Sequence, residues 1–455
     1  NINWMKIHEQ DMSSSLFKNV KDLKPVIRST SDSGALDNVF ELLVHSGKLA
    51  PLIKLMMIPD AWSKRSKTVP KNHQDLFNFL NSTIEPWDGP AAICATDAKW
   101  VLASSDRNGL RPLRYTITSD NLFFAGSESG MIKIPEENII EKGKLGPGQI
   151  IAIDLKKGKL FKDKEIKDFL AKDYKKYSKQ IIDLEKKISH ESEKPNFIKE
   201  ELRKRQYLSG LSVEDLELIL HPMAEEGKEA SGSMGDDTPV AVLSSHFRPV
   251  SHYFRQNFSQ VTNPPIDSLR ENKVMSLKTR FGNLGNILDF DNLTEENIYV
   301  LDSPILTNSQ FKKFKKFFSK KTKTIDCTFN ISSSLKERIE EIREEAETSV
   351  RQGSTCIVLS DKNITDQNAS IPSILTVGAV HSHLVKHGLR GYCSLNVECS
   401  DALDTHSFAV LIGVGATTVN PYLAIDSIYQ RFEKKLFGKS DFESCVLKFK
   451  KSIDA

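Results

Sequence analysis

Two stretches of the sequence place charged side chains where they could bind a substrate or an anion. In SDSGALDN (31–38), Asp32 comes just before an expected helix, where its carboxylate can either cap backbone N–H groups or meet a substrate ammonium. From the residues alone, capping is the stronger interpretation of Asp32. In SSDRNGLRPLRY (104–115), an Asp-Arg-Asn-Gly turn with two more arginines could form an active-site loop, an anion-binding loop or the bend of a hairpin.

The bend interpretation of 104–115 makes the most specific structural prediction. Asn108 and Gly109 are expected to supply the φ > 0 residues of a tight bend, and Pro112 to set where the next strand begins. Three arginines are expected to brace that bend and its neighbours rather than hold an anion: Arg107, Arg111 and Arg114.

A third stretch, HSHLVKH, has histidines at a spacing that zinc sites use. His383 and His387 stand at i and i+4 of an expected helix, and His381 lies two residues earlier. No glutamate lies between the i and i+4 pair, and no third ligand of the metalloprotease type is evident in the sequence. The three histidines are therefore predicted to be partly buried or surface side chains, and no metal site is expected.

Three loops have weaker functional interpretations. GVGATT, with Gly413 and Gly415, lacks the third glycine or following lysine of a phosphate loop and is expected to be a tight turn after an apolar segment. The stiff segment QVTNPPID (260–267) is expected to pack, as a wall or an interface wedge. SGSMGDDTP (231–239) has paired aspartates that could hold a cation, although a turn is the commoner explanation.

The elements that must position these groups begin with helices in residues 1–62. One apolar stripe at 3–4 spacing contains Leu36, Val39, Phe40, Leu43 and Val44. Gly47 is expected to end that helix, and Pro51 to begin a second one. Residues 90–155 change to strand character with short turns, which predicts an antiparallel meander. Part of its sheet is expected to lie outside the chain, because so few strands with two apolar faces cannot bury themselves.

From about residue 296, strand-like runs alternate with amphipathic helices, which predicts a parallel sheet or a partial β/α barrel. One of these helices has a possible capping box in Ser334 and Glu337, and Gly353 is expected to end it.

Between the two patterns lies a lysine-rich segment, 156–205. Because its acidic residues largely offset the lysines, it is expected to be a solvated helical linker rather than a nucleic-acid-binding tail. The predicted division is therefore a first domain over 1–155, this linker, and a second domain over 206–455.

Composition bounds the class of protein. The 455 residues carry a formal net charge of +3, which argues for no nucleic-acid or membrane partner, and no apolar run approaches a membrane helix. The six cysteines are scattered without a C-x-x-C pair, which suits free thiols in a reducing cytoplasm. The chain begins with Asn1 and ends inside a helix-like pattern, so both ends are expected to be cut.

Taken together, these segments resemble the large subunit of glutamate synthase. The first part resembles the end of its class II glutamine amidotransferase domain through NINWM, SDSGALDNVFELL, MMIPDAW, DRNGLRPLRY, AGSESG and LGPGQ. The second resembles its central domain through PMAEEGKEASGSMGDDTPVAVLS, YFRQNFSQVTNPPIDSLRE, VMSL, LDSPIL, AVHSHLV and VNPYLA. The resemblance implies part of an Ntn-type α/β/β/α sandwich followed by an α/β domain like an incomplete β/α barrel.

The function implied by the resemblance is the reductive amination of 2-oxoglutarate to glutamate with ammonia from glutamine. An N-terminal cysteine releases the ammonia, which passes through a tunnel to a flavin site. FMN and a 3Fe-4S cluster are implied for the intact subunit, with none in this chain. A small NAD(P)H-oxidising flavin/iron–sulfur subunit or ferredoxin is implied as partner. Asp32 matches the aspartate that pairs with the α-ammonium of glutamine, whereas Ser382 replaces a common third histidine, which argues against a histidine-dependent role there.

The chain is expected to be inactive alone, because its first residue is Asn1, the oxyanion Asn-Gly segment is expected before it, and the FMN domain after it. Two alternatives stay open at this point: another class II amidotransferase, and a non-catalytic scaffold or binding protein.

Overall fold

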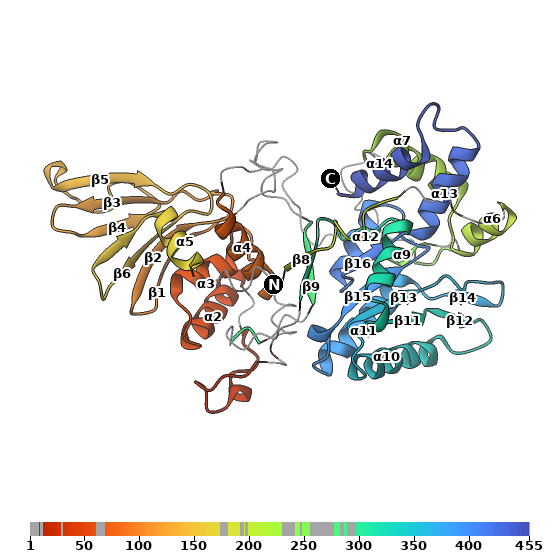
Figure 1. Ribbon diagram of the computed structural model, residues 1–455, viewed down its shortest axis with the longest axis horizontal. Coiled ribbons are helices and arrows are strands. Elements are labelled where there is room, and N and C mark those ends of the chain that lie inside the picture. The colour runs from red at the N-terminus through yellow and green to blue at the C-terminus, as the bar shows by residue number, and fades with distance from the viewer. Residues whose placement is uncertain are drawn as a thin grey trace. The chain divides into compact units, whose positions relative to one another are not determined.

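The structure, a computed structural model, describes residues 9, 12–28, 31–60, 69–172, 181–191, 195, 199–229, 242–245, 248–254, 277–282, 286–288 and 297–454. It divides into two compact units, which are described separately. Unit 1 is formed mainly by Asn1–Ile182, and unit 2 mainly by Asp183–Asn263 and Tyr299–Ala455. Each unit has its own helices and sheets (Figure 1).

The helices of unit 1 share one apolar core. They are α2 (Asp32–His45), α3 (Ala50–Met57), α4 (Lys71–Thr83) and α5 (Asp163–Ala171), with a short 3-10 turn η1 (Val20–Leu23) before them. Helix α2 ends as predicted, since Gly47, with φ +88°, follows its end. Its start differs slightly from the prediction, because Asp32 is its first residue and Ser31 is the cap. Helix α3 has Pro51 in its first turn, as predicted.

The strands of unit 1 form two antiparallel sheets, in the orders β1–β2–β6–β7 and β4–β3–β5. They are β1 (Ala92–Thr96), β2 (Trp100–Ser105), β3 (Arg114–Thr118), β4 (Phe123–Gly126), β5 (Ile139–Lys144), β6 (Ile150–Asp154) and β7 (Lys159–Phe161). The predicted single meander is wrong: β2 pairs with β1 and β6, and the chain passes through the second sheet between β2 and β6. Consecutive strands usually pair, which is why their close spacing suggested one sheet.

Alternation along β2 shows how the layers of unit 1 pack. Trp100 and Leu102 belong to the core shared with the helices, whereas Ala103 packs with Tyr115 and Phe123 of the second sheet. Unit 1 therefore has the layers helix, sheet and sheet, in agreement with the predicted part of an α/β/β/α sandwich (Figure 1).

The lysine-rich segment is not simply a solvated helical linker. Its first part forms β7, which pairs with β6, and α5, whose Ile166, Leu170 and Ala171 are buried in the core of unit 1. The apolar positions of α5 recur at helical spacing, but the surrounding lysines hid that stripe in the overall charge of the segment.

Unit 2 is built on a parallel sheet, as predicted, with the strand order β11–β13–β15–β16. Its strands are β11 (Thr322–Asp326), β13 (Cys356–Ser360), β15 (Ser394–Glu398) and β16 (Thr418–Asn420), and the helices between them are α10 (Leu335–Arg351), α11 (Ser373–Lys386) and α12 (Thr405–Gly413). Ile305 adds a parallel bridge to Val419 of β16. The described strands do not close into a barrel.

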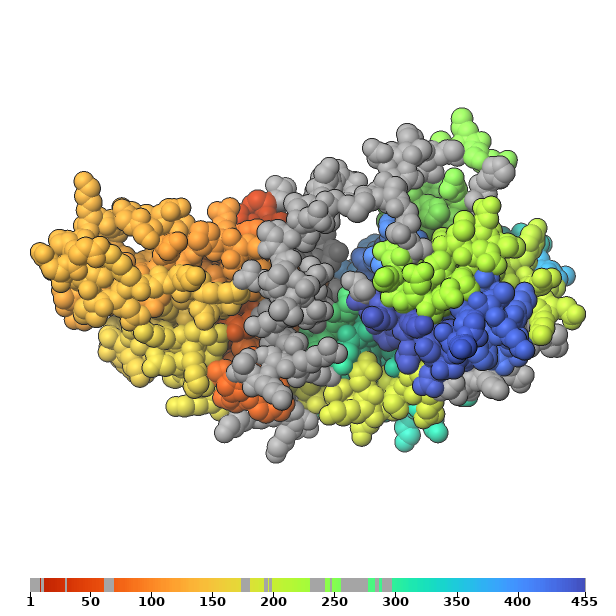
Figure 2. All heavy atoms as spheres, turned by 90° about the horizontal axis from the view of Figure 1, so that it is seen from above, coloured from red at the N-terminus to blue at the C-terminus, as the bar shows by residue number. Residues whose placement is uncertain are grey.

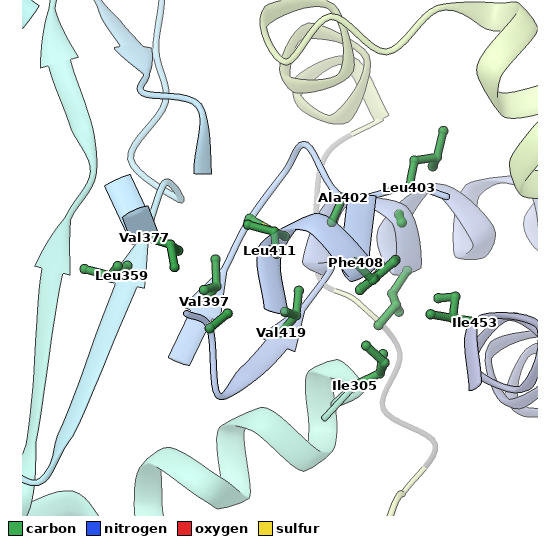
Figure 3. Close-up of a cluster of buried hydrophobic side chains, with 14 of the residues drawn as sticks. Ile305, Leu359, Val377, Val397, Ala402, Leu403, Phe408, Leu411, Val419 and Ile453 are labelled. Atoms are coloured by element: carbon green, nitrogen blue, oxygen red, sulfur yellow. The ribbon is translucent and has the colours of Figure 1, made fainter. Parts of the chain in front are cut away.

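The core of unit 2 lies between this sheet and its helices. Figure 3 shows Leu359, Val397 and Val419 of the strands close to Val377 of α11 and Leu411 of α12. Helix α10 is capped by Ser334, whose Oγ accepts a hydrogen bond from Glu337 N at 3.4 Å, so one half of the predicted capping box is present. Helix α12 was not expected, because its nearly uniform apolar character gives no amphipathic period.

Unit 2 also contains α6 (Lys199–Leu208), the π-helical η4 (Asp215–Leu220), α7 (His221–Glu226), β9 (Thr279–Gly282), α9 (Asn308–Phe317), β12 (Thr328–Asn330), β14 (Asn368–Ser370), α13 (Tyr422–Glu433) and α14 (Phe442–Asp454). Two further strands, β8 (Ile181–Asp183) and β10 (Ile298–Leu301), lie where the chain passes from unit 1 to unit 2. Smaller sheets have the orders β8–β10–β9 and β12–β14. Helix α14 packs against α7 and α13. Figure 2 shows the C-terminal segment with α13 and α14 in blue, beside the lime-green segment that contains α7.

Candidate functional site

Asp32 is the first residue of α2 and is exposed. The cap is Ser31, whose Oγ accepts a hydrogen bond from Gly34 N at 3.1 Å, so the capping role expected of Asp32 belongs to its neighbour. In the part of the chain that the structure describes, no hydrogen bond or ion pair engages the Asp32 carboxylate. An exposed carboxylate in the first turn of a capped helix is held in place by the backbone and can bind a cationic group.

The loop 104–115 is organised by a buried aspartate, Asp106, which is 1% exposed. Its carboxylate accepts backbone hydrogen bonds from Asn108, Leu110 and Arg111 at 2.9–3.0 Å. A fourth comes from Ala91 N at 3.1 Å. This carboxylate therefore connects the loop to the segment before β1, and it replaces water as the partner of four backbone donors.

The bend itself differs from the prediction in two ways. Only Gly109 has a positive φ, of +64°, and Asn108 does not. Arg111 and Arg114 are exposed, and the buried Arg107 Nε has no hydrogen-bond partner among the described residues. The hydrogen bonds that close the bend are made by the Asp106 carboxylate and not, as predicted, by the arginines.

Replacing Gly109 by alanine should destabilise unit 1 by about 2–3 kcal/mol. Its φ is unfavourable for any side chain, and an added Cβ would lie 3.0–3.1 Å from Pro147. Gly158→Ala is the matched control, because Gly158 has φ +61° and no atom within 4 Å of the added Cβ. Urea unfolding followed by tryptophan fluorescence measures both variants, and equal losses would show that the contact with Pro147 costs nothing.

Two buried lysines of unit 1, Lys54 of α3 and Lys167 of α5, contact two other motif segments, LGPGQ and MMIPDAW. Lys54 Nζ donates to the Gly148 carbonyl at 2.7 Å, and Lys167 Nζ lies 2.5 Å from Asp60 Oδ2 and 2.6 Å from Asp163 Oδ1. Burial lowers the pKa of Lys54 to about 8. Burial also opposes the charge of Lys167, but the two carboxylates outweigh it and raise the pKa of Lys167. The Lys54 hydrogen bond therefore joins α3 to LGPGQ, and the ion pair between Lys167 and Asp60 joins α5 to MMIPDAW.

The histidines of HSHLVKH divide between two environments. His381 Nδ1 accepts a hydrogen bond from Arg390 Nε at 3.1 Å, and burial and the Arg390 charge lower the pKa of His381 to about 4. Arg390 also donates to the Gly415 carbonyl at 2.9 Å, and a Cβ at Gly415 would lie 2.3 Å from His381 Nδ1. GVGATT is thus the predicted tight turn, after α12. His383 and His387 lie instead beside Glu347 of α10.

Polar side chains gather where the strands of the parallel sheet end. Glu398, at the end of β15, lies 3.0 Å from Lys315 Nζ and 2.7 Å from Lys362 Nζ. Burial opposes ionisation of Glu398, but the two lysines outweigh it and lower the pKa of its carboxyl. The carboxyl ends of the strands are where α/β proteins commonly bind ligands. Here the charge of Glu398 is already balanced by the two lysines.

Asp361 follows β13 and is 2% exposed. Its Oδ2 accepts hydrogen bonds from Ser370 Oγ at 3.0 Å and from Ser400 N and Oγ at 3.0 and 2.6 Å. Burial and the neighbouring Asp401 nevertheless raise the pKa of Asp361 to about 6.

Asp361 should make unit 2 less stable as pH rises from about 4 to about 6. The pKa of Asp361 is higher in the folded than in the unfolded chain, so the folded state binds more protons between these two pH values. The stability that protonation of Asp361 contributes is therefore fully present below about pH 4 and is lost by about pH 6. Asp361→Asn keeps an acceptor oxygen and lacks the titration, so its stability relative to the unmodified chain should rise across the interval, by up to about 3 kcal/mol. Hydrogen exchange of the β13 and β15 amides, compared at equal pH, measures the difference. A constant difference from pH 4 to 7 would contradict this assignment.

The two parts of the sequence match two family descriptions, in the predicted order. Residues 1–179 match the class-II glutamine amidotransferases. Residues 204–455 match the glutamate synthase central domain. The chain belongs to the glutamate synthase family. The match over 204–455 also separates it from other class II amidotransferases.

Relatives of this glutamate synthase chain match along its whole length. It is 52% identical to the NADPH glutamate synthase large chain of Azospirillum brasilense and 38% identical to that of Bacillus subtilis. It is 35% identical to the ferredoxin-dependent glutamate synthase of Pyropia yezoensis. All three matches cover 100% of the chain and only 30–31% of the relative, so the chain spans less than a third of these proteins.

Two glutamate synthase motifs of unit 2, LDSPIL and VNPYLA, meet in the structure. Asn420 Nδ2 donates to the Leu306 carbonyl and to Asn308 Oδ1, both at 2.9 Å. The segments QVTNPPID and SGSMGDDTP lie outside the described residues, so their predicted roles stay predictions. No helix in the described ranges is both long and apolar enough to span a bilayer.

Sequence reasoning predicted a substrate-binding role for Asp32, which stays a prediction, and it missed the residues that shape the rest of unit 1. The sequence pattern predicted Asp106 only as part of a turn. An Asp followed two residues later by Asn-Gly is, however, a common signal for a side chain that accepts backbone hydrogen bonds. Lys54 stands in the otherwise apolar run LIKLMMI, and a charge in such a run signals a buried group with a polar partner, here the Gly148 carbonyl.

Proposed function

We propose that unit 1 supplies the part of a glutaminase domain that recognises the amino-acid end of glutamine, with Asp32 as the group that pairs with its α-ammonium. The observation that carries this proposal is that Asp32 is exposed at the start of α2 while Ser31 makes the capping hydrogen bond. A carboxylate and an ammonium form a charge-assisted hydrogen bond, which gives the substrate both affinity and direction. The amide of glutamine would then point away from Asp32, toward the nucleophile.

The whole protein is proposed to be a glutamate synthase that uses glutamine-derived ammonia for reductive amination of 2-oxoglutarate. The relatives include an NADPH glutamate synthase and a ferredoxin-dependent one, so the proposed electron donor is either a small NAD(P)H-oxidising subunit or ferredoxin. The free cysteines favour a reducing compartment such as the cytoplasm.

The FMN and 3Fe-4S cluster proposed for the whole protein do not fit the described residues of this chain. Five of the six cysteines are buried, and burial raises the pKa of their thiols, which opposes the thiolate form that an iron–sulfur cluster needs. The GVGATT turn is filled by His381, which leaves no room for a phosphate group at Gly415. We therefore assign both groups to other parts of the protein and derive no step through them.

Unit 2 is proposed to serve as a scaffold and as a wall of the ammonia tunnel, and not as a reaction centre. In support, Glu398 at the edge of its parallel sheet is already paired with two lysines. The full-length protein tests the whole proposal: it should form glutamate from 2-oxoglutarate with glutamine as the nitrogen donor. Activity with free ammonia but none with glutamine would contradict the role given to unit 1.

A further inference from the structure

Three side chains from two helices of unit 2 converge on one point. His383 lies in the last turn of α11 and His387 directly follows the helix, and their ring centroids are 4.4 Å apart. Glu347 of α10 faces both rings: its Oε2 is 2.7 Å from His383 Nε2, and its Oε1 is 3.5 Å from His387 Nδ1. One nitrogen of each ring and one carboxylate oxygen lie within 4.8 Å of one another.

We propose that Glu347, His383 and His387 form a binding site for a divalent transition-metal ion of the zinc class. Two imidazoles and one carboxylate are a common set of protein ligands for such ions, whereas Mg²⁺ and Ca²⁺ prefer oxygen ligands alone. Glu347 is the third ligand that the sequence pattern did not reveal, because it lies 36 residues before His383 on another helix.

The distances suit such an ion. Zinc binds nitrogen and oxygen ligands at about 2.0–2.2 Å, so two tetrahedral ligand atoms are separated by about 3.3 Å. The separation between Glu347 Oε2 and His383 Nε2, 2.7 Å, is shorter than that value, and the three candidate ligand atoms all lie within 4.8 Å of one another. A small rotation of the side chains would therefore replace the Glu347–His383 hydrogen bond with two bonds to the metal.

Charge and exposure suit the ion as well. The Glu347 carboxylate also lies within ion-pair distance of Arg351, whose Nη2 is 2.8 Å from its Oε1. Arg351 Nε donates to Glu347 Oε1 at 2.9 Å, so it can stay as an outer partner that orients the carboxylate while Oε2 binds the metal. The His387 side chain is 36% exposed, which lets water reach the remaining coordination position. The ion would join α10 to α11.

The site can be tested by titrating the purified chain, without a histidine tag and after dialysis against EDTA, with Zn²⁺ in a calorimeter. One equivalent should bind, and His387→Gln should weaken that binding by more than about 10-fold, since even outer partners of a metal commonly contribute 10–100-fold. Glu347→Gln, which keeps the shape of the side chain, should weaken it similarly. Mg²⁺ should not bind at this site.

His45→Gln is the matched control, because His45 is an exposed histidine at i+4 from a single carboxylate, Glu41. It should leave the Zn²⁺ affinity unchanged, and so should Cys94→Ser, which removes the exposed thiol. Circular dichroism checks that each variant is folded. Equal Zn²⁺ affinity in the folded His387→Gln and unmodified chains would overturn the proposal, and so would equal weakening by His45→Gln.

Discussion

Asp32→Asn in the full-length protein should lower kcat/KM for glutamine by about 30- to 1,000-fold. The substitution keeps the size of the side chain and removes the charge that is proposed to pair with the substrate ammonium. Loss of one partner of such a charged hydrogen bond costs about 2–4 kcal/mol, and each 1.4 kcal/mol corresponds to a factor of 10. Steady-state kinetics with glutamine as the varied substrate measures the change.

Two comparisons separate this role from a structural one. Asp37→Asn, at another exposed aspartate of α2, should leave kcat/KM unchanged. Asp32→Asn should keep the ammonia-dependent activity and the stability of the protein, because Ser31 caps the helix and Asp32 contributes at most a favourable charge of about 0.3–1 kcal/mol to its first turn. Unchanged glutamine kinetics in Asp32→Asn would rule out the proposed pairing.

Asp106→Ala should destabilise unit 1 by about 4 kcal/mol or more. The substitution leaves four backbone N–H groups without their acceptor in a site that is 1% exposed. Each unsatisfied buried donor costs about 1–3 kcal/mol, although rearrangement of the loop recovers part of the sum. All four tryptophans of the chain, at positions 4, 62, 87 and 100, belong to unit 1, so urea unfolding followed by tryptophan fluorescence reports on this unit.

Asp120→Ala, in the exposed turn between β3 and β4, provides the control and should change the stability of unit 1 by less than about 0.5 kcal/mol. Asp106→Asn should fall between the two, because an amide oxygen accepts some of the four hydrogen bonds. If Asp106→Ala cost no more than Asp120→Ala, the loop would not depend on this carboxylate.

Local patterns in the sequence predicted much of the secondary structure correctly. Two helices start close to the predicted start signals: α3 has Pro51 in its first turn, and α10 is capped by Ser334. Helix α2 ends just before the predicted stop, Gly47. The strands of the parallel sheet are short apolar runs between amphipathic helices, and that alternation indicates a parallel sheet because each crossover needs a helix. These signals act over a few residues, so they can be read without knowing which segments meet.

The amino-acid sequence by itself therefore determined the helix starts, the parallel sheet, the family resemblance and Asp32 as the candidate for substrate binding. Only the tertiary structure decided which strands pair, that α5 is packed and not solvated, and that Asp106 holds the loop. It also decided the contact between Lys54 and the Gly148 carbonyl, 94 residues apart, and that between Glu347 and His383, 36 residues apart. The physical reason is the same in each case. Capping and helical periodicity depend on neighbours within about four residues, whereas buried ion pairs and strand order depend on which distant segments pack together.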